Sequence, residues 1–250
     1  MADPLLECTD LTKRFEAVTA VDHVDVTVRD EFTSLIGPNG AGKTTFFDLV
    51  AGTTRPTAGR IAFEGEDVTG LSPDVRVHRG LARTYQVTNL FTELPAFENV
   101  RLAVQAVSGP NYVNVLADAL DDTAVNESAN EVLDRVGFDE NRRTLAGDLS
   151  QGYKRLLGIA VALAADPDLL LLDEPTAGLA VDKKERLFDL ISDLADEHAV
   201  LLIEHKLEIV RELSDRLLVM HDGEILATGT PQDVLSDEDV QEAYLRGVSA

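Results

Sequence analysis

The chain has 250 residues, with 22 basic and 45 acidic side chains, so its formal net charge at pH 7 is −23. Because 44% of the residues are hydrophobic, the chain can form a substantial core, which excludes a disordered acidic protein. The acidic balance also argues against direct binding to nucleic acid, whose phosphates need a basic surface, and against direct binding to anionic lipid.

The basic residues are unequally divided, with sixteen arginines and only six lysines. Few lysines, many aspartates and a large negative charge together indicate a cytosol of high salt, because at roughly 1 M salt charge repulsion is screened over about 3 Å. The alternative is an ordinary acidic protein. The composition therefore predicts a halophilic source, such as a halophilic archaeon, with the excess acid on solvent-facing helices such as Asp118–Asp122 and Asp237–Asp239.

Three features bear on the cellular compartment. The single cysteine, Cys8, excludes an internal disulfide, and its apolar neighbours indicate a small core residue rather than a reactive thiol. The first ten residues lack the basic start and apolar run of a signal peptide. The longest nearly apolar stretch, Leu156–Ala165, is too short for a bilayer, which takes about 20 residues. We therefore expect the chain to stay in the cytoplasm.

The first thirty residues have strand patterns. Val24, Val26 and Val28 alternate with polar residues, which is typical of a half-buried strand. The predicted elements after the first thirty residues are the strand Phe32–Ile36, the helix Thr45–Ala51, the hairpin Gly59–Val68 with its turn at Glu64–Glu66, and a short strand at Ala82–Gln86.

The rest of the chain alternates between helical and strand patterns. Helices are predicted at Asn99–Val107, Glu127–Val136, Gln151–Ala165, Leu187–Leu194 and Leu207–Leu213. Strands are predicted at Leu169–Leu172, Val200–Ile203, Arg216–Met220 and Glu224–Ala227, the last two as a hairpin around His221–Gly223. Four successive leucines are typical of a buried parallel strand.

This alternation predicts an α/β domain with a mostly parallel core sheet. The N-terminal strands and the 59–68 hairpin form a smaller antiparallel layer beside it. No repeat or linker divides the chain, so residues 1–250 are expected to be one folding unit. A helical insertion starts near residue 90 and ends near 148, or near 165 with the helix that follows. Ligands are expected where the core strands end.

Residues Gly37–Thr44 read GPNGAGKT and match the phosphate-loop pattern G-x-x-x-x-G-K-[ST] between a predicted strand and helix. The glycines let the backbone curl, so that its N–H groups and the helix N-terminus meet phosphate oxygens. Lys43 adds positive charge at the β- and γ-phosphates, and the Thr44 hydroxyl can bind Mg²⁺. A glycine-rich turn with an incidental lysine is the alternative. The other residues assigned to nucleotide binding are Gly37, Pro38, Asn39, Gly40, Ala41, Gly42 and Thr45.

The four-leucine strand ends in an acidic pair, Asp173 and Glu174. An aspartate after a buried strand near the phosphate loop can hold Mg²⁺ through water, and Glu174 would then polarise the attacking water. A solvated Asp-Glu turn is the alternative, which the phosphate loop upstream disfavours. Together the two motifs predict hydrolysis of a nucleoside triphosphate.

Between the two motifs, Leu149–Tyr153 reads LSQGY and opens a predicted helix. Here the chain resembles the ABC ATPase family, P-loop NTPases whose cassettes carry an L-S-G-G-Q signature at this place. Ser150 and Gly152 match the signature, whereas Gln151 and Tyr153 depart from it. Ser150 also suits a helix N-cap. In the family this helix start reaches the γ-phosphate of the opposite subunit, which implies that Ser150 and Gly152 contact ATP across a dimer.

Further residues fall at positions that the family uses. Phe15 resembles the aromatic residue that stacks on adenine, although a core phenylalanine is the alternative. Gln86 resembles the Q-loop glutamine that touches Mg²⁺ or the attacking water and links it to the transmembrane partner. His205 resembles the switch histidine that hydrogen-bonds the γ-phosphate. Ala180 departs from the D-loop, which usually ends in Asp or Asn, and so puts a cross-subunit hydrogen bond in doubt. The other histidines, at 23, 78, 198 and 221, are expected in surface or turn positions.

The resemblance covers nearly the whole chain and is most specific for the ATP-binding subunits of branched-chain amino acid importers. The stretches that carry it are PTAGRIAFEGEDVTGLSP, GLARTYQVTNLFTELPAFENV, LLIEHKLEIV and GTPQDVLSDEDVQEAYLRG. It implies an ATPase that binds ATP and Mg²⁺ at the cytoplasmic face of the membrane. Its partners would be transmembrane permeases, a second cassette and, indirectly, an external solute-binding protein. Related urea and lipopolysaccharide transporters, and a soluble iron–sulfur assembly ATPase, remain open alternatives.

Overall fold

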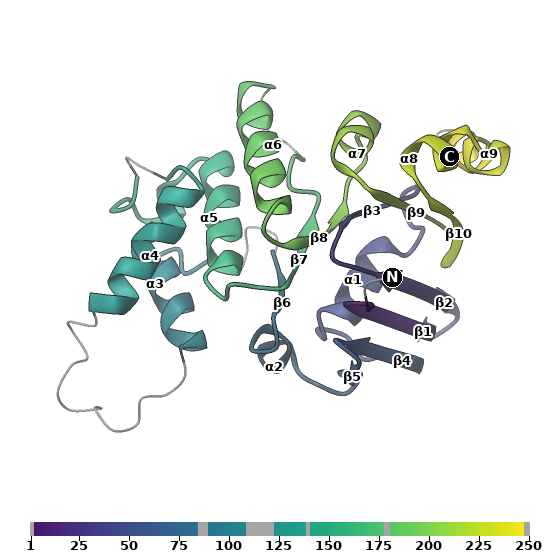
Figure 1. Ribbon diagram of the computed structural model, residues 1–250, viewed down its shortest axis with the longest axis horizontal. Coiled ribbons are helices and arrows are strands. Elements are labelled where there is room, and N and C mark those ends of the chain that lie inside the picture. The colour runs from purple at the N-terminus through teal and green to yellow at the C-terminus, as the bar shows by residue number, and fades with distance from the viewer. Residues whose placement is uncertain (1–2, 85–89, 109–122, 139–140, 178–180, 248–250) are drawn as a thin grey trace.

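The computed structural model describes residues 3–84, 90–108, 123–138, 141–177 and 181–247, which Figure 1 draws in colour. A central sheet lies between two groups of helices, and a second sheet lies beside it (Figure 1). Among the described helices, none is both long and apolar enough to cross a membrane. Three sequence predictions fall outside the described residues, namely those for Gln86, Ala180 and the acidic run Asp118–Asp122.

The central sheet has six strands in the order β10-β9-β3-β8-β7-β6. From β9 to β6 all neighbours run parallel, and β10 pairs antiparallel with β9 at one edge. The predicted, mostly parallel core sheet is therefore confirmed. Its strands are β3 (Phe32–Ile36), β6 (Leu81–Arg83), β7 (Leu169–Asp173), β8 (Ala199–Ile203), β9 (Arg216–His221) and β10 (Glu224–Gly229).

The second sheet is antiparallel and has the strand order β2-β1-β4-β5. Val24, Val26 and Val28 are buried and alternate with more exposed neighbours, as their spacing predicts. The predicted hairpin also forms, with Glu64 and Gly65 at positive φ in its turn. The strands of this sheet are β1 (Leu6–Phe15), β2 (Val18–Val28), β4 (Ala58–Phe63) and β5 (Glu66–Asp67).

Within the described residues all the helices that the sequence predicts are present, together with others that it does not predict. The unpredicted α-helices are α2 (Pro73–Val77), α8 (Pro231–Ser236) and α9 (Glu238–Gly247). Helices α2 and α8 have five and six residues, too few to show a helical period, whereas α9 has ten residues and is amphipathic. Helix α6 begins at Val181, well before the predicted start at Leu187. The predicted helices are α1 (Lys43–Val50), α3 (Ala96–Val107), α4 (Thr123–Arg135), α5 (Gln151–Leu163), α6 (Val181–Ala195) and α7 (Leu207–Leu213).

The leucine strand β7 separates two hydrophobic cores. Because side chains alternate along a strand, Leu170 and Leu172 face the core that includes α3, α4 and α5, whereas Leu169 and Leu171 face α1 and the antiparallel sheet. All four leucines are fully buried. Helices on both faces explain why β7 is apolar throughout. Asp173, at the carboxyl end of this strand, lies near α1.

Candidate functional site

The loop between β3 and α1 depends on its glycines for two different reasons. A Cβ atom at Gly37 would lie 2.1 Å from the carbonyl oxygen of Met220, and one at Gly42 would lie 2.1 Å from that of Ala20. These two glycines therefore let the loop pass close to β9 and β2. Gly40 has open space around it, but its φ of +83° favours glycine. Gly42 combines both constraints, because its φ is +104°.

Gly42 is the N-cap of α1, and no side chain caps this end of the helix. The amide N–H groups of the first helical turn are left without intrahelical partners, and they carry the positive end of the helix dipole. Backbone N–H groups at such a position bind phosphate oxygens well. Asn39, Gly40 and Thr44 are exposed around this end, so an anion has open access to it.

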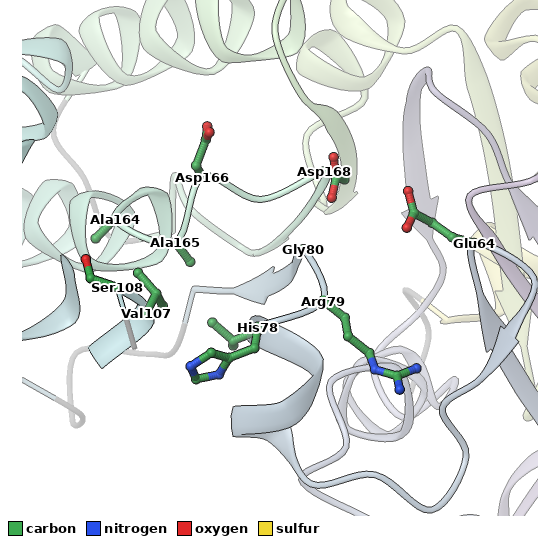
Figure 2. Close-up of a pocket in the computed structure, with 11 residues that line it drawn as sticks. Glu64, His78, Arg79, Gly80, Val107, Ser108, Ala164, Ala165, Asp166 and Asp168 are labelled. Atoms are coloured by element: carbon green, nitrogen blue, oxygen red, sulfur yellow. The ribbon is translucent and has the colours of Figure 1, made fainter. Parts of the chain in front are cut away.

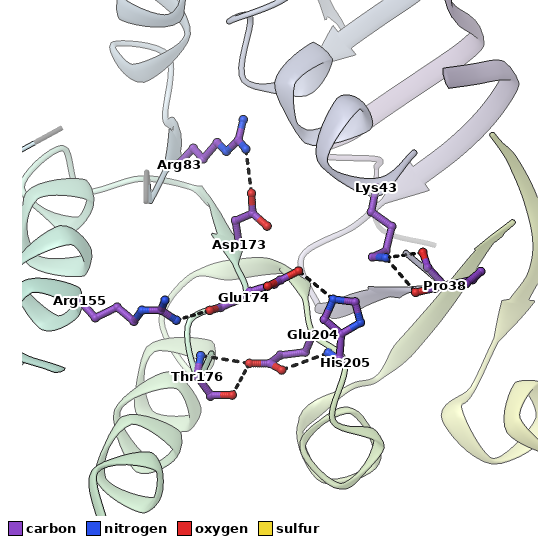
Figure 3. A network of polar contacts seen from close by, with 10 residues as sticks. Pro38, Lys43, Arg83, Arg155, Asp173, Glu174, Thr176, Glu204 and His205 are labelled. Atoms are coloured by element: carbon purple, nitrogen blue, oxygen red, sulfur yellow. Dashed lines mark hydrogen bonds and ion pairs between the residues drawn. The ribbon is translucent and has the colours of Figure 1, made fainter. Parts of the chain in front are cut away.

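Lys43 is folded back along its own loop. Its Nζ donates to the carbonyl oxygens of Gly37 at 2.8 Å and Pro38 at 2.9 Å, as Figure 3 shows. Burial lowers the pKa of Lys43, and the nearby carboxylates of Glu174 and Asp173 oppose this shift. The lysine is therefore a buried cation whose charge two neutral carbonyls solvate, with two acidic side chains close by. An anionic phosphate would be a stronger acceptor than either carbonyl.

Asp173, at the end of β7, is held by an arginine that the sequence analysis did not single out. Arg83 Nη2 donates to Asp173 Oδ2 at 2.9 Å, and Arg83 Nη1 donates to Asp48 Oδ1 at 2.6 Å. The side chains of Arg83 and Asp173 are only 7% and 6% exposed. Arg83 thus joins the strand β6, the acidic end of β7 and helix α1. Within the described residues, no hydrogen bond to the other oxygen, Asp173 Oδ1, is found.

Glu174 adopts a backbone conformation that is unusual for its residue type. Its φ is +45°, in the left-handed region, which costs a non-glycine residue about 1–2 kcal/mol. Its backbone is held on both sides: its N–H donates to the carbonyl of Ile203 at 3.0 Å, and its carbonyl accepts from the Arg155 side chain of helix α5 and from Ala177 N at 3.2 Å. Backbone strain of this kind is concentrated at functional sites.

The side chains of Glu174 and His205 meet at the carboxyl edge of the central sheet. His205 Nε2 donates to Glu174 Oε1 at 2.8 Å (Figure 3). The two side chains are 34% and 41% exposed, so water reaches both. The structure thus brings together the predicted general base and the predicted switch histidine.

A buried acid, Glu204, lies beneath this pair. It is 3% exposed and accepts hydrogen bonds from Thr176 and from the backbone N–H of His205. Neither Glu204 nor Thr176 was singled out from the sequence. The signal available was a single acidic residue that directly precedes His205 at the end of an otherwise apolar strand.

Two predicted nucleotide contacts lie away from this cluster. Phe15 is 48% exposed, which rules out the core phenylalanine considered from sequence, and Lys13 Nζ lies 4.8 Å from its ring centroid. Ser150 is the N-cap of α5 and accepts from Tyr153 N at 3.5 Å. In Figure 1, α5 lies with α3 and α4, apart from α1. Ser150 and Gly152 therefore do not join the phosphate loop of their own chain.

The remaining predicted residues divide by exposure. Pro38 and Thr45 are half-buried, whereas Ala41 is buried. His23 and His78 are exposed, as expected, and His221 is half-buried. For His198 the surface alternative is wrong: it lies in the turn before β8 but is 9% exposed, because its ring bonds the carbonyl of Pro167 and the guanidinium of Arg135.

A separate hollow of about 570 Å³ lies at the other end of the sheet (Figure 2). Gly80 and Asp168, which precede β6 and β7, line it together with His78, Arg79 and Asp166. Phosphate loop, Asp173 and His205 all follow the carboxyl ends of their strands, whereas this hollow faces the amino ends. Ligands of parallel sheets bind at the carboxyl ends, so this hollow is not part of the nucleotide site.

The fold and the site define a P-loop ATPase of the ABC-cassette type. Comparison with known proteins agrees: the model of the family described as ABC transporter matches residues 21–177. A second model, described as branched-chain amino acid ATP-binding cassette transporter, matches residues 224–245. The chain belongs to the ABC transporter family, and it is an ATPase that couples ATP hydrolysis to transport.

Individual relatives cover nearly the full chain. It is 38% identical to the high-affinity branched-chain amino acid transport ATP-binding protein BraF of Pseudomonas aeruginosa, over 98% of this chain and 99% of that protein. It is 33% identical to the lipopolysaccharide export system ATP-binding protein LptB of Haemophilus influenzae, over 96% and 97%. A crystal structure of the ADP conformation of an ABC-transporter cassette superposes with a TM-score of 0.84 at 30% identity, over 98% and 99%. The predicted fold class is confirmed.

Proposed function

We propose that the chain is the ATP-hydrolysing subunit of an ABC importer that takes up branched-chain or similar hydrophobic amino acids through partner permeases. The hydrogen bond between His205 and Glu174, beside the buried Lys43, is the observation that carries the catalytic part. The similarity to BraF and the match of residues 224–245 support the choice of solute.

The hydrolytic step uses groups at the ends of three strands. Lys43 exchanges its two loop carbonyls for oxygens of the β- and γ-phosphates, and the N–H groups at the start of α1 bind further phosphate oxygens. Glu174 accepts a proton from the attacking water, and His205 orients the Glu174 carboxylate and meets the γ-phosphate. Preorganised charge at the phosphates supplies most of the rate enhancement.

Magnesium binding fits the donors that are present. Within the described residues, no group of three or more His, Cys, Asp or Glu side chains is placed to hold a metal. Mg²⁺ normally takes one or two protein ligands together with substrate phosphates and water. We assign the Thr44 hydroxyl and the Asp173 oxygen opposite Arg83 to it, and Gln86 as a further contact. When bound, the ion neutralises charge on the β- and γ-phosphates.

The complete ATP site needs a second cassette. Phe15, exposed at the end of β1, stacks on the adenine, and the α5 N-terminus with Ser150 and Gly152 closes on the γ-phosphate bound by the opposite subunit. Because alanine has no side-chain acceptor, we do not expect residue 180 to supply the family's D-loop hydrogen bond across this dimer. Light scattering with and without ATP tests the association: an ATP-dependent dimer is expected, and a monomer at all ATP concentrations would contradict it.

Helices α3 and α4 offer a surface for the permease. A cleft of about 460 Å³ lies there, lined by Pro95, Phe97, Glu98, Asn130, Arg142 and Arg143. Phe91 nearby in the chain is 61% exposed. We propose that a permease segment docks here and holds the cassette at the cytoplasmic face of the membrane, with no lipid insertion and no nucleic acid contact.

Fractionation of cells distinguishes this importer from a soluble ABC ATPase such as one for iron–sulfur assembly. Co-expressed with its permeases, the chain should sediment with membranes, and without them it should not. Purely soluble behaviour in the presence of permeases would support the soluble alternative. Neighbouring genes for two permeases, a second cassette and a solute-binding protein would support the importer.

The solute is decided by uptake, because the cassette itself does not contact it. The similarity to LptB leaves a lipid transporter as an alternative, and a urea transporter is a second one. A strain that lacks the gene should lose high-affinity uptake of labelled leucine, and the intact gene should restore it. Normal leucine uptake with lost urea uptake, or with altered lipid export, would select one of the alternatives.

We also propose that the chain is a single ATPase domain in which residues of about 90–165 form a helical subdomain.

We propose in addition that the chain works in a high-salt cytosol. The net charge of −23 and the exposed acids Asp237, Glu238 and Asp239 support a high-salt environment. ATPase activity and dimerisation should fall in dilute buffer and recover in about 1 M KCl, because the Debye length then shrinks to about 3 Å. Full activity in dilute buffer would contradict a halophilic origin.

A further inference from the structure

Glu204 is a buried carboxylate for which the hydrolytic step described above has no use. It lies 3% exposed, between the acidic end of β7 and the residue His205. Burial of a carboxylate is costly unless several donors bind it. A buried carboxylate such as Glu204 either stabilises the fold or positions neighbouring residues, and its contacts indicate which of these two roles it has.

Three donors bind Glu204, and they come from two different segments. Its Oε1 accepts from Thr176 N at 3.1 Å and from Thr176 Oγ1 at 2.6 Å. Its Oε2 accepts from the backbone N–H of His205 at 3.1 Å. The two oxygens of one side chain therefore join the turn after Glu174 to the segment that carries His205, as the dashed lines in Figure 3 show.

The turn that Glu204 holds includes the strained residue Glu174. Ala177 N donates to the carbonyl of Glu174 at 3.2 Å, so residues 174–177 form one tight turn. Thr176 is anchored within this turn by Glu204, and its hydroxyl also accepts from Lys206 Nζ at 3.0 Å. Movement of Thr176 would consequently change the position from which Glu174 reaches His205.

The guanidinium of Arg155 attracts the buried Glu204 carboxylate electrostatically, in addition to the hydrogen bonds that Glu204 accepts. Burial lowers the pKa of Arg155, and the negative charges of Glu204 and Glu174 oppose that shift, with Glu204 the stronger of the two. Arg155 donates in turn to the carbonyl of Glu174. The turn at residues 174–177 is therefore contacted by one negative side chain, Glu204, and by two positive ones, Arg155 and Lys206.

We propose that Glu204 is a positioning residue that keeps Glu174 and His205 at hydrogen-bond distance by binding Thr176 with one oxygen and the backbone of residue 205 with the other. It acts through these neighbours and touches no substrate. The inference rests on the proposed function, because it assumes that Glu174 and His205 carry out hydrolysis.

The chemistry of the three donors decides which variants are informative. Glu204→Gln keeps the shape but replaces one acceptor oxygen by an NH₂ group, which cannot accept from either segment. One of the two arms is therefore lost. Thr176→Val removes the hydroxyl donor and keeps the backbone N–H, whereas Thr176→Ser keeps both. Glu238→Gln, at an exposed acid on α9, is a matched control for the charge change.

The test measures kcat, KM for ATP and the affinity for a fluorescent ATP analogue in each variant, after thermal melting has shown that it is folded. Since a misplacement of about 1 Å costs on the order of 100-fold in rate, Glu204→Gln should lower kcat by about 10- to 100-fold. KM and analogue affinity should change less than about twofold, since Lys43 and the loop are untouched. Thr176→Val should lower kcat by about tenfold, and Thr176→Ser and Glu238→Gln should stay near the parent.

Two outcomes would overturn the proposal. The first is that Glu204→Gln and Thr176→Val have the same kcat as the control variant Glu238→Gln. The other is a parallel loss of kcat and analogue affinity, which a general structural defect would produce. If Glu204→Gln does not fold, the comparison of Thr176→Val with Thr176→Ser decides by the same criteria.

A double variant separates this inference from the proposed function. If Glu204 acts through Glu174, adding Glu204→Gln to Glu174→Gln should not reduce the residual turnover further. An additive loss would contradict the proposal. If Glu174→Gln keeps the ATPase activity of the parent protein, the proposed function is contradicted. If Glu174→Gln is inactive but Glu204→Gln is as active as the parent, only the role of Glu204 is overturned.

Discussion

His205 Nε2 lies 2.8 Å from Glu174 Oε1, although 31 positions separate the two residues in the chain. The parallel register explains the contact. Asp173 pairs with Ile203 across β7 and β8, so the residues that follow these two strand ends come out side by side. The adjacency of the acid and the histidine is therefore a property of the sheet, and each of the two side chains limits where the other can point.

Replacement of Glu174 by glutamine should separate ATP binding from hydrolysis. The amide keeps the shape and the contact with His205, but it cannot take a proton from water, so turnover should fall by about 100-fold or more. Affinity for ATP should remain within about twofold of the parent, and the ATP-bound dimer should accumulate. Phosphate release, analogue binding and gel filtration measure the three quantities. Glu212→Gln, at an exposed acid on α7, is the control, and near-normal turnover of Glu174→Gln would remove Glu174 from its role.

His205→Ala should lower turnover in the same way as Glu174→Gln. The variant removes the hydrogen bond from His205, so the Glu174 carboxylate is free to rotate. We expect a loss of about 10- to 100-fold in kcat. The double variant with Glu174→Gln should lose little more than the worse single variant, since residues that act as a unit are non-additive. Steady-state kinetics of the four proteins gives the coupling directly. Strictly additive losses would mean that the hydrogen bond plays no part in catalysis.

The sequence predicts the frame of this site well and its supporting residues poorly. The glycine spacing, the four leucines of β7 and the acidic pair are local patterns, so the phosphate loop and the sheet follow from them. Phe15 is local too, and its exposure agrees with the functional alternative over the core one.

Supporting residues such as Arg83 and Glu204 depend on tertiary neighbours. Arg83 binds Asp173 across 90 positions because β6 happens to lie beside β7, and nothing near Arg83 in the chain indicates it. His198 shows the same limit, since its burial comes from Arg135 on α4 and Pro167 before β7. The sequence analysis does not predict helix α8, although Thr230 caps it and Pro231 is its first residue, which is a local signal for a helix start. A helix of six residues is too short to show a hydrophobic period as well.

Alanine substitutions should separate the two reasons for glycine in the phosphate loop. Gly40→Ala meets no neighbour within 4 Å and should cost only its positive φ, about 1–2 kcal/mol of unfolding free energy. Gly42→Ala adds a Cβ atom 2.1 Å from the carbonyl of Ala20, so it should cost more and should also weaken nucleotide binding by displacing α1. Urea unfolding and analogue binding measure both effects. Equal losses for the two variants would mean that the approach of β2 to the loop does not constrain Gly42.

The thiol of Cys8 should be inert in the folded protein. Burial raises its pKa to about 12, so at pH 8 only about one thiol in 10,000 is ionised. A coloured disulfide reagent should therefore react with it only after denaturation. The pKa of the unfolded thiol is lower, so above pH 9 the unfolded state loses a proton that the folded state keeps, and this contribution to stability falls as the pH rises from 9 towards 12. Cys8→Ala should show a flatter decline in that window, and rapid labelling of the native protein would contradict the burial.

Arg83 should matter for stability and for magnesium, because it pairs with the buried carboxylate of Asp173, which we propose as a magnesium ligand. Arg83→Met leaves the 6% exposed Asp173 without its partner, and such a loss typically costs about 3–5 kcal/mol. The freed carboxylate can then rotate, so if Asp173 binds the ion, ATP affinity measured with Mg²⁺ should fall more than affinity measured in a chelator.

Two further variants locate the effect of Arg83. Arg83→Lys keeps one charge but cannot reach both acids with a fork of donors, so it should recover part of the stability and little of the Mg²⁺ dependence. Asp48→Asn, which leaves the bond from Arg83 to Asp173 in place, should retain most of that dependence. Analogue titrations at several Mg²⁺ concentrations measure it. Equal losses with and without Mg²⁺ in Arg83→Met would show that Arg83 stabilises the fold without orienting Asp173 for the metal.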